Sequence, residues 1–242
     1  VTGNNLAGIY MGITPEEGQN YQSTPFTIEG LTNVVKIFVG ETQRAALLSN
    51  GYVKTWGIEL LCSEWDRIPQ SSTPIDADEM NYNSPVTDIA FGEHYAVMLG
   101  KIDIYAPYPN SNLYTWGENS DQRSGYTNYT QMCPYPAPRI DNVRDVELSR
   151  TSTIITMNDG TLRVWGINPN GQLGNGTNTQ VFEPTPLDGI SGVTQVSMSP
   201  TSTIVLLDDG TIKSFGQNTE GQLGDGTTTN RLSPVVIKIY KD

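Results

Sequence analysis

The sequence has few of the side chains that bind metals or transfer protons. Its 242 residues include one histidine and two cysteines. A zinc site built from cysteine and histidine needs about four such ligands, so the composition excludes it. A single histidine provides no Ser–His–Asp or Cys–His set, and we expect His94 to be a structural or surface residue. We therefore predict a non-catalytic chain with no metal, no cofactor and no catalytic residue.

Basic residues and long apolar segments are also scarce. Lysine and arginine number 14 against 26 aspartate and glutamate residues, a formal charge of −12. Phosphate backbones are bound by clustered lysine and arginine, so we expect no nucleic-acid partner. No segment approaches the roughly 18 apolar residues of a membrane span, and there is no apolar leader of the signal-peptide type. The chain starts at Val1, which indicates a processed chain or a fragment.

The dominant feature of the sequence is an internal repeat. Residues 151–176 read TSTIITMNDGTLRVWGINPNGQLGNG and residues 201–226 read TSTIVLLDDGTIKSFGQNTEGQLGDG, an offset of 50 with no gap. Residues 42–57, TQRAALLSNGYVKTWG, and 94–117, which end in LYTWG, are weaker copies. An aromatic residue followed by glycine recurs in every copy and is predicted to pack in the core between repeats. These aromatic residues are Trp56, Trp116, Trp165 and Phe215.

The pattern within one repeat predicts four short antiparallel strands. The runs VTQVSMS, STIVLLD and TIKSFG are rich in β-branched residues and alternate with period two. Asp209-Gly210 between two runs predicts a tight hairpin, and the glycine-rich NTEGQLGDGT predicts a loop. A fourth run follows a proline, as PTPLDGI or SPVVIKIY, and the proline favours an edge strand.

Such sheets are apolar on both faces and must be covered on both. Radial packing of the sheets buries the two faces and gives a β-propeller; a β-solenoid, the alternative, has shorter rungs. We predict an all-β fold, a single β-propeller domain of four-stranded antiparallel blades, about four complete and one partial at the N-terminus. The expected repeats are 1–30 (partial, with an outer strand near 23–30), 31–85, 86–142, 143–192 and 193–242.

The repeat resembles a known family. The ladder of Asp159-Gly160, Trp165-Gly166 and the GQLG motif at 171–174 is similar to the regulator of chromosome condensation (RCC1-like) repeat, clearly over 143–242 and with erosion over 31–142. The resemblance implies a propeller, in that family usually of seven blades. The family's inner strand commonly carries Gly-x-x-His-Ser, and the histidine is missing from that position in every copy here.

The number of repeats is smaller than that family's ring requires. Three interpretations remain open: a smaller ring, an arc, or a ring that another subunit completes. An arc leaves sheet faces and edges exposed. We therefore expect a partner chain, as a homo-oligomer or a larger assembly.

Candidate binding residues lie where the repeat is interrupted. Nine extra residues lie in KIDIYAPYPNSN of the second repeat, and SDQRSGYTNYTQMCPYP follows its tryptophan. Tyrosine provides large contact area and a hydroxyl, and loops that break a repeat commonly carry function. The alternative is that these tyrosines pack on their own blade. The candidate ligand- or partner-binding residues are Tyr105, Tyr108, Tyr126, Tyr129, Tyr135 and Trp65.

Three further patterns carry less information. The GQLG loops lack the following helix and Lys-Ser/Thr of a phosphate-binding loop, so they are predicted to be tight turns. Cys62 and Cys133 follow the aromatic-glycine pairs of neighbouring repeats, where free thiols are the default and a disulfide is the alternative. The acidic residues around Asp76 and Asp78 lack calcium-loop spacing, and we expect solvated carboxylates.

Together these features favour a non-catalytic protein- or glycan-binding or structural module that binds through its interrupting loops. A low proportion of charged residues, 17%, and few lysines suit an extracellular, cell-surface or virion location. The family resemblance implies one alternative, a regulator of a small GTPase. A proteinaceous enzyme inhibitor is another. A glycoside hydrolase would need two carboxylates about a central channel, and the sequence shows no such spacing.

Overall fold

The computed structural model describes 3–4, 21–22, 27–40, 42–57, 60–61, 67–68, 71–76, 85–93, 95–100, 112–119, 125, 131–136 and 140–237. The regular structure of these residues is entirely β, which confirms the all-β prediction. Among them no helix is long and apolar enough to traverse a membrane. The chain divides into two compact units, unit 1 (Val1–Glu118 with Gln131–Asp141) and unit 2 (Asn119–Thr130 with Asn142–Asp242).

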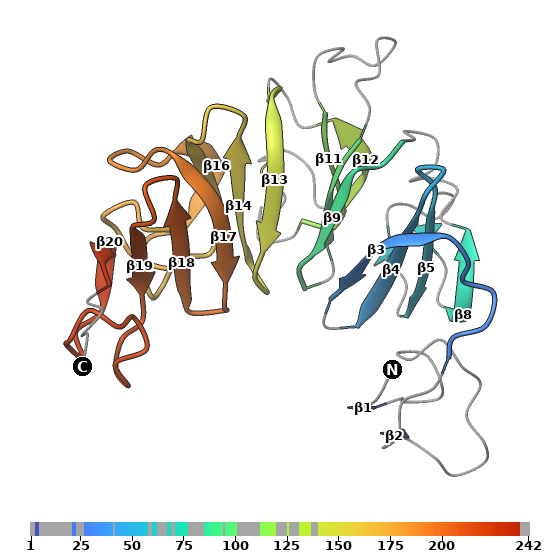
Figure 1. Cartoon of the computed structure of the whole chain (residues 1–242), viewed down its shortest axis with the longest axis horizontal. Coiled ribbons are helices and arrows are strands. Elements are labelled where there is room, and N and C mark those ends of the chain that lie inside the picture. The colour runs from blue at the N-terminus through green and yellow to red at the C-terminus, as the bar shows by residue number, and fades with distance from the viewer. Residues whose placement is uncertain are drawn as a thin grey trace. The chain divides into compact units, whose positions relative to one another are not determined.

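Unit 1 contains two four-stranded antiparallel sheets, here called blades 1 and 2 (Figure 1). Blade 1 has the order β3-β4-β5-β8: Val34–Val39, Gln43–Leu48, Val53–Gly57 and Ser71–Asp76. Blade 2 has the order β9-β10-β11-β12: Asp88–Phe91, Tyr95–Leu99, Leu113–Glu118 and Gln131–Pro136. Two short pairs accompany them, β1 (Gly3–Asn4) with β2 (Tyr21–Gln22) and β6 (Leu60–Leu61) with β7 (Arg67–Ile68).

Unit 2 contains blades 3 and 4, which have the same strand order (Figure 1). Blade 3 is β13-β14-β15-β16: Val143–Leu148, Ser152–Met157, Leu162–Gly166 and Val181–Pro186. Blade 4 is β17-β18-β19-β20: Val193–Met198, Ser202–Leu207, Ile212–Gly216 and Arg231–Val236. The four blades are thus the four complete repeats expected from the sequence.

The partial N-terminal repeat differs from its prediction. An outer strand was expected near 23–30, but residues 27–30 are not in a strand, and Glu29 and Gly30, the latter with a φ of 79°, form a turn. Residues 23–26 lie outside the described residues. Nearer the N-terminus, β1 pairs with β2 through Gly3 opposite Gln22.

One apolar core lies between the two blades of each unit. In unit 1, Ala45, Leu47 and Val53 of blade 1 pack with Ile89 and Met98 of blade 2. In unit 2, blade 3 contributes its second and third strands and its glycine-rich loop, and blade 4 contributes its first three strands. Burial of apolar surface at about 25 cal/mol per Å² is the main stabilising term for such sheets. Each sheet is therefore stable because its neighbour covers it.

The recurring aromatic residues occupy equivalent places in the blades. The Trp165 and Phe215 side chains are fully buried, and Trp56 is also buried. Phe215 belongs to the core between blades 3 and 4. Trp116 lies on β11 opposite Ala96, and its side chain is outside the described residues.

The glycine after each aromatic residue is required by the backbone. Gly57, Gly117, Gly166 and Gly216 all have φ between 107° and 114°. A Cβ on Gly216 would lie 2.4 Å from the carbonyl oxygen of Thr201. The aromatic-glycine pair thus combines a core side chain with a conformation that only glycine adopts easily.

The outer strands of blades 3 and 4 begin earlier than predicted. In blade 3 the outer strand is Val181–Pro186, whereas the sequence analysis placed it over PTPLDGI. The ladder to the third strand is irregular opposite the aromatic residue, since Val164 pairs with Thr185 and Gly166 with Val181. Pro184 lies at this irregularity, directly before Thr185. A proline stands at this place in every blade: Pro74, Pro134, Pro184 and Pro234.

An asparagine organises each glycine-rich loop of unit 2. Asn218 accepts a hydrogen bond from the Leu223 amide at 2.9 Å and donates to the Thr227 carbonyl at 3.0 Å. Asn168 makes the corresponding bonds in blade 3. Asn218 is fully buried, so these bonds offset the desolvation of its amide. The GQLG segments are thus tight turns, as expected.

Blade 4 adds an ion pair to this loop. Asp225 accepts from Arg231 Nε at 2.7 Å and from the Thr227 hydroxyl at 2.7 Å. The Thr227 hydroxyl and the Arg231 guanidinium hold the pKa of Asp225 well below its ordinary value of 3.8. In blade 3 the equivalent residues are Asn175 and Val181.

Substitution of Gly216 by alanine is expected to destabilise the protein more than substitution of Gly210. Both glycines have positive φ, but a Cβ at Gly210 meets nothing within 4 Å. We expect Gly216→Ala to lower the free energy of unfolding by about 3 kcal/mol and Gly210→Ala by about 1 kcal/mol. Urea denaturation followed by circular dichroism measures both. Equal losses would show that the close approach to Thr201 is unimportant.

Substitution of Asp225 by asparagine is expected to weaken the acid dependence of stability. Because folding lowers this pKa, the carboxylate stabilises the fold above pH 3.8, and the contribution is lost as the pH falls below that value. The difference in the urea midpoint of unfolding between wild type and Asp225→Asn should therefore be largest near pH 7 and shrink towards pH 3. Asn175→Asp in blade 3 is the control. It places a carboxylate at the equivalent position, where the equivalent of Arg231 is Val181, which cannot form an ion pair. A difference independent of pH would contradict the assignment.

Candidate functional site

The two tyrosine-rich loops of blade 2 lie at opposite ends of its sheet. Leu99 pairs with Leu113 next to the loop between β10 and β11, whereas Glu118 pairs with Gln131 next to the loop between β11 and β12. We call the first end, where the second and third strands of each blade are joined, the hairpin end. We call the other the glycine-loop end. The candidate residues therefore fall into two separate groups.

The hairpin end of three blades is built on one turn. Asn50 Oδ1 accepts from the amide of Tyr52 at 3.0 Å, and Asp209 Oδ1 accepts from the amide of Thr211 at 2.8 Å. In blade 3 the equivalent bond joins Asp159 and Thr161 at 2.9 Å. The bonds from Thr161 lower the pKa of Asp159, and those from Thr211 lower the pKa of Asp209. The three blades share this hydrogen bond, and the residue that donates it varies.

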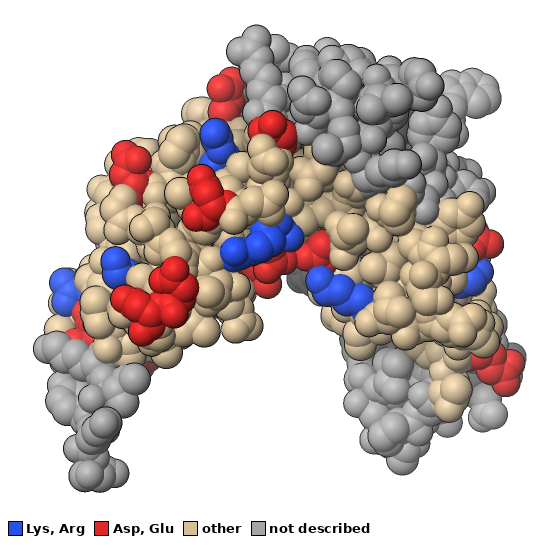
Figure 2. Space-filling model, turned by 45° about the horizontal axis from the view of Figure 1, so that its top comes forward, with Lys and Arg blue, Asp and Glu red and all other residues tan. Residues whose placement is uncertain are grey.

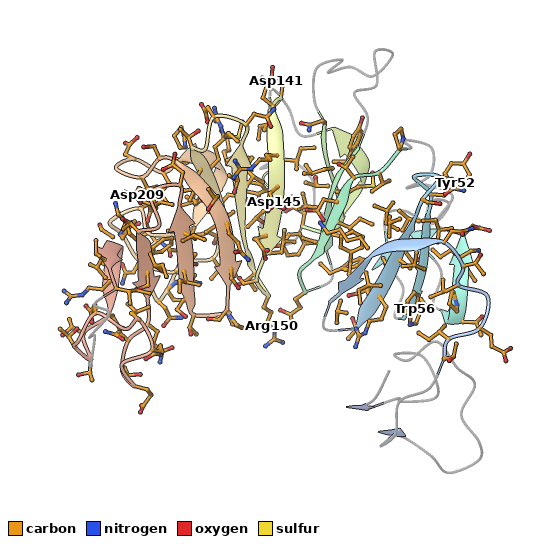
Figure 3. All side chains as sticks on the ribbon, in the orientation of Figure 1. Tyr52, Trp56, Asp141, Asp145, Arg150 and Asp209 are labelled. Atoms are coloured by element: carbon orange, nitrogen blue, oxygen red, sulfur yellow. The ribbon has the colours of Figure 1, made fainter. Side chains whose placement is uncertain are left out.

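That variable position is Tyr52 in blade 1 and threonine in blades 3 and 4. Tyr52 is 48% exposed, and Figure 3 shows it at the end of the blade 1 sheet opposite to Trp56. An exposed tyrosine on a short hydrogen-bonded turn presents an aromatic face with little rotamer freedom to lose on binding. Sequence analysis missed Tyr52 because it treated this turn only as a repeat landmark.

The interrupting loop of blade 2 starts and ends at the end of unit 1 where the turn of Tyr52 lies. The Gly100 amide donates to the Asn112 carbonyl at 3.0 Å, which closes the base of the loop. The Val86 amide donates to the Gly51 carbonyl at 3.1 Å, so the turn of Tyr52 is bonded to the segment leading into blade 2. Residues 101–111, which include Tyr105 and Tyr108, lie outside the described residues.

The other candidates belong to the glycine-loop end or are not described. Tyr126, Tyr129 and Trp65 lie outside the described residues, as do His94 and Cys62. Tyr135 lies on β12 opposite Thr115, but its side chain is not described, nor is that of Cys133 on the same strand. Gly125 is buried in unit 2, where a Cβ would lie 3.2 Å from Trp165 Nε1. Tyr126 is therefore next in sequence to a residue packed against blade 3.

Unit 1 also buries polar groups without hydrogen-bond partners among the described residues. They include both amide atoms of Gln43 and the hydroxyls of Thr55 and Thr115, together with Trp56 Nε1. In unit 2, Ser152, which pairs with Gly166 as Gln43 pairs with Gly57, donates to the Ile167 carbonyl. Blade 1 therefore departs from the repeat at this place as well.

Charge and metal ligands provide no second site in the described part of the chain. Figure 2 shows lysine, arginine and acidic residues intermixed on a surface that is mostly uncharged. Lys54 pairs with Asp76 at 3.0 Å. No group of three or more histidine, cysteine or acidic residues that could hold a metal occurs within the described residues.

Comparison with known proteins places the repeat in a family. A model of the regulator of chromosome condensation (RCC1) repeat matches residues 159–206 and 209–242, and a second RCC1 repeat model matches 193–222. Residues 159–242 therefore contain RCC1-like repeats. No curated protein sequence matches it significantly.

Solved structures share the fold of this chain. Human WBSCR16 aligns with a TM-score of 0.76 and 19% identity over 98% of this chain and 61% of its own. Yeast RCC1 (Prp20), in a crystal structure bound to Kap60, aligns with a TM-score of 0.73 and 20% identity over 92% of this chain and 53% of its own. This chain therefore spans 61% of the length of WBSCR16 and 53% of the length of Prp20. The likeness confirms the blades as those of a β-propeller fold.

Proposed function

We propose that this RCC1-like chain is a non-catalytic binding module for a protein partner and that the partner binds at the hairpin end of unit 1. The observation that carries the proposal is Tyr52, 48% exposed on a turn where the equivalent blades of unit 2 have threonine. The loop with Tyr105 and Tyr108 leaves the same end. This end is where both the turn residue and the loop length depart from the repeat.

The chemistry of this end supports a protein more than a charged ligand. Tyrosine contributes disproportionately to protein interfaces because a rigid ring buries much area and its hydroxyl forms hydrogen bonds. The nearby turn atoms are neutral: Asn50 replaces the aspartate of blades 3 and 4. Structural relatives also bind proteins, since yeast Prp20 has been crystallised with Kap60 and is described as binding Gsp1p and histones.

The location we propose is an extracellular, cell or virion surface. It rests on composition alone: 17% charged residues and few lysines. A glycan is the other ligand compatible with exposed tyrosines. A glycan array run beside the protein-binding assay separates the two ligand classes.

Tyr52→Thr tests the site directly, because it installs the residue of blades 3 and 4. Once a partner has been recovered by affinity capture, we expect Tyr52→Thr and Tyr105→Ala each to weaken its binding at least tenfold, about 1.4 kcal/mol. The measurement is titration of the purified pair by calorimetry. Thr211→Ala, at the equivalent turn position of blade 4, is the matched control and should bind normally.

The outcome of this comparison is decisive for the site. Unchanged affinity in both tyrosine variants would remove the hairpin end of unit 1 as the binding surface. Equal losses in the variants and in Thr211→Ala would indicate a general effect on folding. Circular dichroism of each variant distinguishes that case.

A small-GTPase regulator is the second candidate. The observation that favours it is the RCC1 repeat itself, together with the reported binding of Gsp1p by Prp20. The test is release of a fluorescent nucleotide from a panel of small GTPases. Accelerated release that Tyr52→Thr abolishes would make the GTPase the partner. No acceleration across the panel would exclude the regulator and leave the binding module.

A further inference from the structure

The first strand of a blade carries apolar residues that are buried when another blade precedes it in its unit. In blade 2 these are Ile89 and Phe91 of β9, with Val86 just before the strand, and all three belong to the core with Ala45 and Leu47 of blade 1. In blade 4, Val193 and Val196 are buried in the same way and Met198 packs against the core. The side chains of blade 3 that cover them include Ile154 and Leu162. We call these first-strand positions the leading positions.

The leading positions of blade 1 are apolar and exposed. The strand ladders align Val34, Ile37 and Val39 with the leading positions of blades 2 and 4. Their exposed fractions are 38%, 69% and 68%. Lys36 is the charged residue of β3. Its Nζ forms an ion pair with Asp88 of blade 2 at 2.6 Å, so its side chain lies on the opposite face of the sheet. Exposed apolar side chains adjacent on one strand are unfavourable in water unless a partner covers them.

Blade 4 exposes apolar side chains on its opposite face, the face that in blades 1 and 3 meets the next blade. Ile204 pairs with Ser214 as Ile154 pairs with Val164 in blade 3 and as Ala45 pairs with Thr55 in blade 1. Ala45 and Ile154 are fully buried beneath the next blade, whereas Ile204 is 42% exposed. The neighbouring Leu206 and Ile212 are partly exposed as well. We call this the trailing face of blade 4.

We propose that two copies of this chain associate head to tail, with the trailing face of blade 4 in one copy packed on the leading positions of blade 1 in the other. The occupant is argued from the molecule itself. The same contact, trailing side chains on leading ones, already occurs within each unit. One chain carries both halves of it, and both halves are apolar.

A contact of this kind joins two different surfaces and is heterologous. Such contacts form closed rings when the rotation closes and extended chains of subunits when it does not. A pair of copies would bring together eight blades of equal strand order. The proposal is independent of the partner site at the hairpin end, because it uses the faces of the sheets.

Sedimentation velocity of the intact chain over a range of concentrations tests the association. We expect wild type to self-associate and Ile37→Asp to weaken the association at least tenfold, since a carboxylate would be buried in an apolar contact. Ile204→Asp should have the same effect from the other side. Val35→Asp is the matched control: Val35 lies on the same strand, and its equivalents Thr87 and Thr194 are exposed beside a preceding blade.

Cross-linking of mixed copies tests the orientation. With Cys62 and Cys133 replaced by serine, one preparation carries Ile37→Cys and another Ile204→Cys. A short bismaleimide should give covalent dimers in the mixture far in excess of either preparation alone. Val35→Cys mixed with Ile204→Cys is the control and should give fewer dimers.

Three results would overturn the proposal. One is a wild-type chain that stays monomeric and forms no cross-linked dimers. Another is a chain carrying both Ile37→Cys and Ile204→Cys that links only to itself, which would show contact within one chain. The third is self-association that neither aspartate variant weakens, which would place the contact elsewhere on the molecule.

Discussion

Burial of one sheet by the next is the interaction on which the structure depends. A four-stranded sheet of this size has apolar residues on both faces and cannot bury them alone. Within each unit the second and third strands of one blade meet the first strands of the next, with Ala45 and Ile154 at corresponding places. Stability is therefore a property of neighbouring pairs, and an aspartate at Ile89 or Val196 should affect two blades at once.

That packing determines which positions of the repeat are fixed and which can vary. Positions that touch the neighbouring blade, such as Phe215, and the glycine beside it are fixed by core volume and backbone conformation. Turn positions beyond the ladder make only local hydrogen bonds, as at Tyr52 and Thr211. Residues there can change without disturbing the core, and this is why a binding surface can develop at the hairpin end while the blades stay alike.

The blades were predictable because their signals are local and repeated. Period-two strands, the Asp-Gly turns and the aromatic-glycine pairs each reflect a short-range constraint, and the fold class follows from them. The outer strand was misplaced because its pairing depends on an irregular ladder opposite Trp165 and not on its own alternation. Tyr52 was missed because exposure on a turn depends on what the adjacent segment covers, which a turn motif does not encode.

The prolines in the outer strands have a consequence for how these molecules can meet. Each outer strand is the exposed edge of its sheet, and Pro74, Pro134, Pro184 and Pro234 each remove an N–H from that edge. A foreign strand adding to such an edge would find its hydrogen-bond ladder broken part-way along. Propagation of the sheets into continuous cross-β fibrils is thereby discouraged at the rim of every blade.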